Sequence, residues 1–112
     1  MKHLTLVLFL LTLAALPARG QDQTSKPQVI VVGPVVTLNW NASTSSGIDH
    51  YNVYSSATSG SGYILIGTSK TLTFKDLTAT AGNTYYYVVT AVDGSGNESA
   101  YSNQATAVIP SS

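Results

Sequence analysis

The segment from Ala81 to Asp93 constrains the fold of this chain more than any other part of the sequence. It starts with the turn-forming residues Ala-Gly-Asn and continues as Thr-Tyr-Tyr-Tyr-Val-Val-Thr-Ala-Val-Asp, rich in residues that favour strands. A tyrosine directly after a tight turn is typical of the penultimate strand of a β-sandwich, where its hydroxyl ties the corner between two sheets. We therefore predict that the Tyr85 hydroxyl bonds to backbone between Leu77 and Gly82.

Apolar segments alternate with Gly-, Pro- and Ser-containing turns along the rest of the chain. The predicted strands cover residues 28–32, 35–40, 50–55, 63–67, 71–74, 84–92 and 100–109. No helical periodicity occurs after residue 20. Seven short strands at this spacing predict an all-β sandwich.

The alternation of side chains along each strand predicts which residues face the core. The residues expected to point inward are Val36, Leu38, Trp40, Tyr51, Val53, Leu72, Phe74 and Tyr87. Trp40 is expected to pack between the two sheets, against residues such as Tyr51 and Val89. Tyr54 and Tyr86 are one position away from inward residues and are expected on the outer face.

The N-terminus has the composition of a secretory signal peptide. A basic start precedes an apolar core of 13 residues, Leu4 to Leu16, and the sequence Pro-Ala-Arg-Gly then ends at Gly20. Cleavage is expected before Gln21. The alternative is a membrane anchor, which needs about 20 apolar residues, and this apolar segment is shorter than that. We predict a signal peptide at 1–20, a flexible lead-in at 21–26 and one sandwich domain at 27–110, secreted and with no membrane span after cleavage.

The composition after residue 20 excludes several classes of protein. Three lysines against five carboxylates leave a net charge of −2, which argues against nucleic acid as a partner. The chain has no cysteine, so no disulfide can form, and its stability has to come from burial. Only 9% of the residues are charged, so Ser, Thr, Asn and Gly supply most of the polarity.

From residue 27 to residue 110 the chain resembles a fibronectin type III domain, and in particular the variety found in secreted bacterial proteins. The resemblance rests on Leu38-Asn39-Trp40, Tyr51-Asn52-Val53-Tyr54, Ala81-Gly82-Asn83-Thr84-Tyr85, Val89-Thr90-Ala91-Val92-Asp93 and Gly96-Asn97-Glu98-Ser99-Ala100-Tyr101-Ser102-Asn103. It implies a seven-stranded immunoglobulin-like β-sandwich.

Two features depart from the pattern of this family. Ala81 stands where a proline is common before the corner tyrosine, and Leu77 precedes Tyr85 by eight residues instead of six. Either Leu77 or Ala79 is therefore expected to fill the core position beside the corner. The loop at 93–97 has no arginine, so integrin binding is not implied.

Other polar residues have simpler structural explanations than catalysis or metal binding. His50 beside Asp49 is expected to be a polar pair that opens a strand, because no strained nucleophile turn accompanies it. The oxygen-rich stretch from Asp93 to Glu98 is too short for a calcium loop and is expected to be a hairpin turn. We predict no catalytic, metal or cofactor site. Asn41 and Asn97 match the N-glycosylation pattern, which matters only in a host that glycosylates secreted proteins.

The candidate binding surface is the outer face of the third and sixth predicted strands. If Val53 pairs with Tyr87, Tyr54 lies opposite Tyr86, with Asn52 and Val88 beside them. Two adjacent exposed rings could stack on a sugar or anchor a protein. The alternative is a cross-strand aromatic pair that only stabilises the sheet.

These observations predict a secreted, non-enzymatic module that binds a protein or a cell-surface or extracellular glycan, or has a structural role. Its expected location is extracellular, or periplasmic in a Gram-negative host. Two alternatives remain open. The resemblance implies that such a domain can be an accessory or spacer beside a secreted carbohydrate-active enzyme. The apolar strand at 28–32, with only Lys26 and Pro27 before it, could instead pair with another chain through its edge. The oligomeric state stays open.

Overall fold

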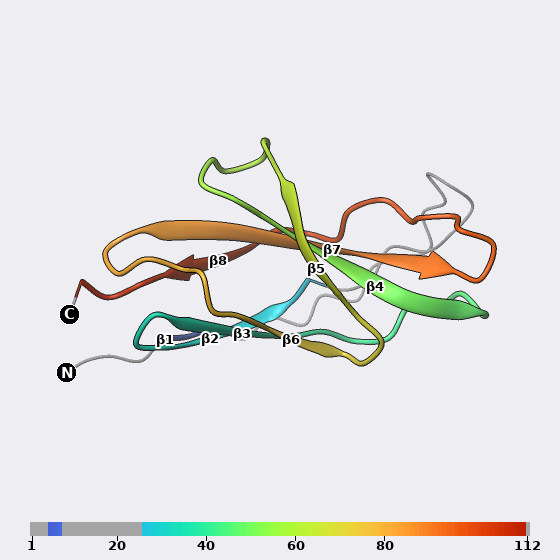
Figure 1. Ribbon diagram of the computed structural model, residues 1–112, viewed down its shortest axis with the longest axis horizontal. Coiled ribbons are helices and arrows are strands. Elements are labelled where there is room, and N and C mark those ends of the chain that lie inside the picture. The colour runs from blue at the N-terminus through green and yellow to red at the C-terminus, as the bar shows by residue number, and fades with distance from the viewer. Residues whose placement is uncertain (1–4, 8–25, 112) are drawn as a thin grey trace.

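A computed structural model describes residues 5–7 and 26–111, which form two antiparallel β-sheets packed face to face (Figure 1). The first sheet has the order β1-β2-β3-β6, with β1 at Thr5–Val7, β2 at Gln28–Val32, β3 at Val35–Asn39 and β6 at Thr73–Asp76. The second sheet has the order β5-β4-β7-β8, with β4 at Ile48–Ser56, β5 at Ile64–Ser69, β7 at Thr84–Asp93 and β8 at Ala105–Val108. The predicted all-β sandwich is confirmed.

Most of the predicted signal peptide at 1–20 and lead-in at 21–26 lies outside the described residues. The exceptions are Thr5–Val7, which pair with β2, and Lys26. Within the described part of the chain, no helix is long and apolar enough to cross a membrane.

The core lies between the sheets and is made by alternate residues of each strand. Val29, Val31, Val36 and Leu38 come from the first sheet, and Val53, Tyr87, Val89 and Ala91 come from the second. Trp40 is buried and meets the Tyr51 ring edge-on, with 5.7 Å between ring centroids. Both sheets thus contribute one apolar face, as sandwich packing requires.

The corner before β7 is held by the hydroxyl of Tyr85. This oxygen accepts a hydrogen bond of 2.9 Å from the backbone N–H of Thr80, which lies inside the interval expected from the sequence. Ala79 is buried and Leu77 is 71% exposed, so the smaller residue fills the core position at this corner.

A buried carboxylate lies beside the same corner. Asp76 is 4% exposed, and its Oδ2 accepts a 2.6 Å hydrogen bond from the Tyr87 hydroxyl. Its Oδ1 accepts from the backbone N–H and the hydroxyl of Thr78, at 2.9 and 2.6 Å. Burial, together with this bond to Asp76, raises the pKa of Tyr87 well above its ordinary value. The polar groups at the corner therefore satisfy one another.

Several predicted strand boundaries differ from the structure, most clearly those of the third, fifth and last strands. The fifth predicted strand, 71–74, is found at Thr73–Asp76, and Leu72 is 40% exposed instead of inward. Leu72 precedes the strand, and its carbonyl accepts a hydrogen bond from the backbone N–H of Trp40. The last strand covers only Ala105–Val108, because serine side chains replace regular pairing in the residues before it. The third is longer than predicted and begins at Ile48.

Candidate binding surface

The segment between β7 and β8 turns back and runs along the edge of β7. The N–H of Ser99 donates to the carbonyl of Ala91 at 2.8 Å, and the N–H of Ser102 donates to the carbonyl of Val89 at 2.9 Å. The hydroxyl of each serine accepts from the N–H of the same β7 residue, at 2.9 and 3.0 Å. Each buried serine therefore satisfies both backbone groups of its β7 partner.

This segment carries one residue more than the stretch of β7 beside it. Val89 and Ala91 are two positions apart, whereas Ser99 and Ser102 are three apart. An extra residue breaks the alternation of side chains and redirects those between the paired positions, as in a β-bulge. Tyr101 lies between the two serines and is 42% exposed.

Tyr101 belongs to a group of three tyrosines, which we call the outer tyrosine cluster: Tyr54, Tyr63 and Tyr101. Tyr54 points outward from β4 because Tyr51 and Val53 on either side point into the core. The Tyr101 ring meets Tyr54 at a centroid distance of 5.2 Å and an angle of 74°. It meets Tyr63, just before β5, at 5.1 Å and 64°. These are edge-to-face contacts, the favoured geometry for aromatic pairs.

Glu98 closes one end of the outer tyrosine cluster. Its Oε2 accepts a short hydrogen bond from the Tyr54 hydroxyl. The same oxygen accepts from the Thr90 hydroxyl at 2.6 Å and from the Asn52 side-chain amide at 3.2 Å. Three donors on two strands thus fix a half-buried carboxylate beside the rings.

Gln104 closes the other end of the cluster. Its Oε1 accepts from the Tyr63 hydroxyl at 2.5 Å and from the backbone N–H of Gly60 at 2.7 Å. Its Nε2 donates to the Ser59 hydroxyl at 3.0 Å. The side chain ties the loop before β5 to the segment before β8, and a polar group therefore borders the rings on both sides.

Two hydroxyls of the cluster, those of Tyr54 and Tyr63, hold their protons more tightly than free tyrosines do. Burial, followed by the hydrogen bond to the Glu98 carboxylate, raises the pKa of Tyr54 to about 12. Burial also raises the pKa of Tyr63. Both groups are neutral donors near neutral pH, which suits hydrogen bonding and not nucleophilic chemistry.

The fold can be compared with that of a solved structure, the Fn3-like protein from Clostridium thermocellum. The two chains are 31% identical, with a TM-score of 0.72, and the match covers 80% of this chain and 94% of the clostridial one. The chain belongs to the fibronectin type III family. No protein-family model matches this fibronectin type III domain.

Curated relatives of the domain are much longer proteins. It is 39% identical over 94 residues to an amylopullulanase of Thermoanaerobacterium thermosulfurigenes, a match that covers 79% of this chain and 5% of that enzyme. It is 43% identical over 72 residues to chitinase A1 of Niallia circulans, covering 63% of this chain and 9% of the chitinase. The domain thus spans less than a tenth of the length of these two relatives.

The structure corrects the predicted pairing of Tyr54 with Tyr86. Val53 pairs with Val89 and not with Tyr87, so Tyr54 lies opposite Val88 and Tyr86 lies opposite Ser56. The register is shifted by two residues, which keeps each side chain on its predicted face but changes its neighbour. Of the four predicted surface residues, Tyr54 and Asn52 converge on Glu98, and Tyr86 is separate from them.

Val88 was expected on the exposed face of the fibronectin type III domain, and this expectation is wrong. Its side chain points to the outer face but is only 1% exposed. The Ser99–Ser102 segment runs beside it, and the ring of Tyr54 comes from the residue opposite. Val88 therefore belongs to a small apolar layer on the outer face of the second sheet, separate from the core between the sheets.

The other polar candidates have structural partners. Asp49 lies between His50 and Lys70, at 2.8 and 3.2 Å, and these bonds lower the pKa of its carboxyl. Asp93 Oδ1 accepts from the N–H groups of Ser95 and Asn97, both at 2.9 Å. This carboxylate organises the turn after β7, as the hairpin interpretation of the Asp93–Glu98 stretch expects.

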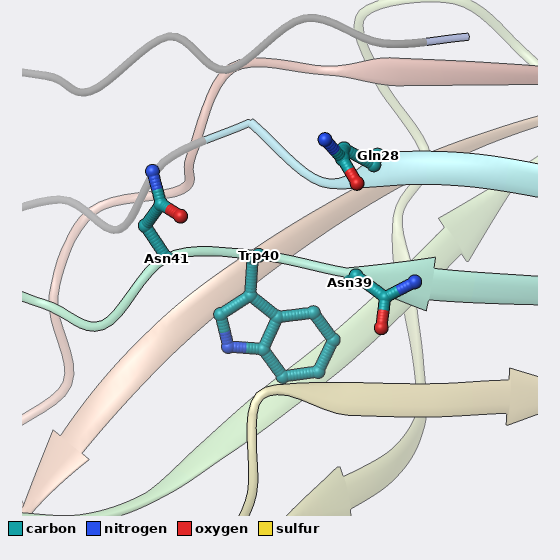
Figure 2. A pocket seen from close by; sticks show the side chains of 4 residues that line it. All are labelled: Gln28, Asn39, Trp40 and Asn41. Carbon is teal, nitrogen blue, oxygen red and sulfur yellow. The ribbon is translucent and has the colours of Figure 1, made fainter.

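A small hollow beside Trp40 is a weaker candidate. Its volume is about 120 Å³, and its lining consists of Gln28, Asn39, Trp40 and Asn41. In Figure 2 the Trp40 indole and the Asn41 amide leave the chain in opposite directions. Nε1 of Trp40 is buried and has no hydrogen-bond partner in the described part of the chain. The amides around the hollow therefore do not converge on this donor.

Sequence reasoning missed four residues of the surface: Tyr63, Tyr101, Glu98 and Gln104. Strand alternation placed Tyr63 and Tyr101 within regular strands, although both lie in irregular segments. The available signal was the spacing of Ser99 and Ser102, two buried serines that hold the segment against β7.

Proposed function

We propose that this domain is a secreted, non-catalytic accessory module that binds neutral glycan chains through the outer tyrosine cluster. The observation that carries the proposal is the exposed Tyr101 ring, bordered by Glu98 on one side and Gln104 on the other. The relatives named amylopullulanase and chitinase support a role beside a carbohydrate-active enzyme.

The chemistry of the surface suits a sugar. A pyranose has an apolar face that packs on an aromatic ring and hydroxyls that bond to side chains at the ring's edge. Tyr101 supplies the ring, and the carboxylate of Glu98 and the amide of Gln104 supply acceptors already held in place by protein donors. Little side-chain freedom is left to lose when a ligand binds.

The ring angles favour a single chain over a crystalline surface. A flat crystal face needs coplanar rings, whereas the Tyr101 ring is inclined by 74° and 64° to its two neighbours. We therefore propose contact with one sugar unit of a soluble or amorphous glycan. Glu98 is an anionic group at the site, so neutral glycans are favoured over polyuronic acids by like-charge repulsion.

The small share of the relatives that the domain covers favours a second candidate, a spacer that binds nothing. A module that makes up 5% of an amylopullulanase could have no ligand, and its role would then be to separate other parts of that protein. In that case the outer tyrosine cluster would serve only to cover Val88.

Affinity electrophoresis tests the proposal. We expect soluble starch, glycol chitin or hydroxyethyl cellulose to retard the domain, and polygalacturonate not to retard it. Tyr101→Ser should weaken the retardation about tenfold or more, because it removes the exposed ring. Tyr86→Ser is the matched control, since Tyr86 is on the same sheet but outside the cluster, and its retardation should be unchanged.

Two results would overturn glycan binding. The absence of retardation by every neutral glycan would leave the spacer function. Equal weakening in Tyr101→Ser and Tyr86→Ser, with both variants folded by circular dichroism, would place any contact elsewhere.

A further inference from the structure

The outer edge of β2 is occupied by a strand that the sequence predicts to be removed. β1 pairs antiparallel with β2 in the register Thr5↔Val31, Leu6↔Ile30 and Val7↔Val29. These residues fall within the predicted signal peptide, so cleavage before Gln21 would take β1 away. The backbone N–H and C=O groups of β2 that face β1 would then lack partners, which makes the edge a template for another strand.

The β2 edge lacks the features that normally discourage such pairing. Residues 28–32 contain no charge and no proline, and they pair with β3 without interruption from Gln28↔Asn39 to Val32↔Val35. Two of the other edges, β6 and β5, differ. β6 carries Lys75 and Asp76, and β5 pairs with β4 across a register shift at Val53/Tyr54. Charges and bulges of this kind protect natural sheet edges.

We propose that, after removal of residues 1–20, β2 pairs antiparallel with β2 of a second copy and forms a two-fold symmetric dimer centred on Ile30. In this pairing Ile30 lies opposite Ile30 of the partner subunit, in the place that Leu6 has in the single chain. Val29 lies opposite Val31 of the partner subunit, where Val7 now pairs. Each copy offers the same surface to the other, as a two-fold interface requires.

A second copy fits the edge on chemical grounds. The sequence Val29-Ile30-Val31 resembles the Val7-Leu6-Thr5 run that it would replace, since both consist of residues that favour strands and carry no charge. Two β2 strands joined in this way would connect the first sheet of one copy to the first sheet of the other as one continuous sheet. The pairing depends on the predicted cleavage but not on glycan binding by the outer tyrosine cluster, which lies on the other sheet.

The test uses the chain from Gln21 to Ser112. The hydrophobic core cluster lies within residues 29–109, so this segment carries its own core. In sedimentation equilibrium between about 10 μM and about 1 mM, the mass should rise from one copy towards two. A wild-type segment that stays monomeric at about 1 mM would overturn the proposal.

Charge substitutions locate the interface. Ile30→Lys and Ile30→Glu each place like charges directly opposite one another across the two-fold axis, so each variant alone should remain monomeric. An equimolar mixture of the two should dimerise again, which a misfolded variant could not do. Leu65→Lys on the exposed β5 edge is the control and should dimerise like the wild type. Failure of the mixture to associate, or loss of the dimer in Leu65→Lys, would contradict pairing through β2.

Discussion

The two faces of the second sheet both carry tyrosines, but the surroundings of these tyrosines differ. On the inner face, Tyr51 and Tyr87 are at most 6% exposed, and the Tyr87 hydroxyl donates a hydrogen bond to the buried Asp76 carboxylate. On the outer face, Tyr54 and Tyr63 are half-buried, and Tyr101 is exposed beside polar side chains. The same residue type stabilises the fold on one face and offers a contact surface on the other.

The difference follows from strand parity and from one irregular segment. Alternation along β4 and β7 decides which tyrosines enter the core. The segment that Ser99 and Ser102 hold against β7 then places Tyr101 and Glu98 over the outer face, where Val88 would otherwise face solvent. Removal of an inner ring should therefore lower stability strongly, whereas removal of an outer ring should mainly affect binding.

The largest effect is expected from the replacement of Trp40, whose ring faces Tyr51 in the core. Trp40→Ala removes a buried indole and leaves a cavity, so the free energy of unfolding should fall by about 3–5 kcal/mol. Urea denaturation followed by circular dichroism measures this loss. Tyr101→Ala should cost about 1 kcal/mol, because it removes only the edge-to-face contacts of a half-exposed ring. Comparable losses in the two variants would erase the distinction between the faces.

A smaller effect is expected at the corner. Tyr85→Phe keeps the ring and removes only the hydroxyl that accepts from the Thr80 N–H, so the free energy of unfolding should fall by about 1 kcal/mol. Tyr86→Phe, one residue along β7 and on the opposite face, should change it by less than about 0.5 kcal/mol. Thermal unfolding of both variants distinguishes the corner tyrosine from its neighbour, and a larger loss in Tyr86→Phe would contradict the assignment.

A further effect, confined to alkaline pH, concerns the pH dependence of stability. The pKa of Tyr54 is about 12 in the folded chain and about 10 in an unfolded one. Between these values the unfolded chain releases its proton while the folded chain keeps it, so stability falls as the pH rises from 10 to 12. Tyr54→Phe removes this contribution and should show a shallower decline in urea titrations across that range. Identical slopes would mean that the hydroxyl is not held by Glu98.

Much of this architecture could be predicted from the sequence, and the errors have a physical origin. Period-two alternation identified the strands and their inward faces, and a register shifted by two residues leaves those faces unchanged. That is why Val53 was correctly placed inward although its predicted partner, Tyr87, was wrong. Alternation could not place Tyr101, because its position depends on an extra residue between Ser99 and Ser102.

The outer face of the second sheet can be mapped directly by nuclear magnetic resonance during titration with a neutral oligosaccharide such as maltohexaose, chitohexaose or cellohexaose. Glycan binding by the outer tyrosine cluster predicts that backbone amide shifts change with ligand concentration around Tyr54, Tyr63 and residues 98–104, while those around Trp40 and Tyr87 stay constant. Shift changes centred on the first sheet, or no change with any of the three oligosaccharides, would contradict it.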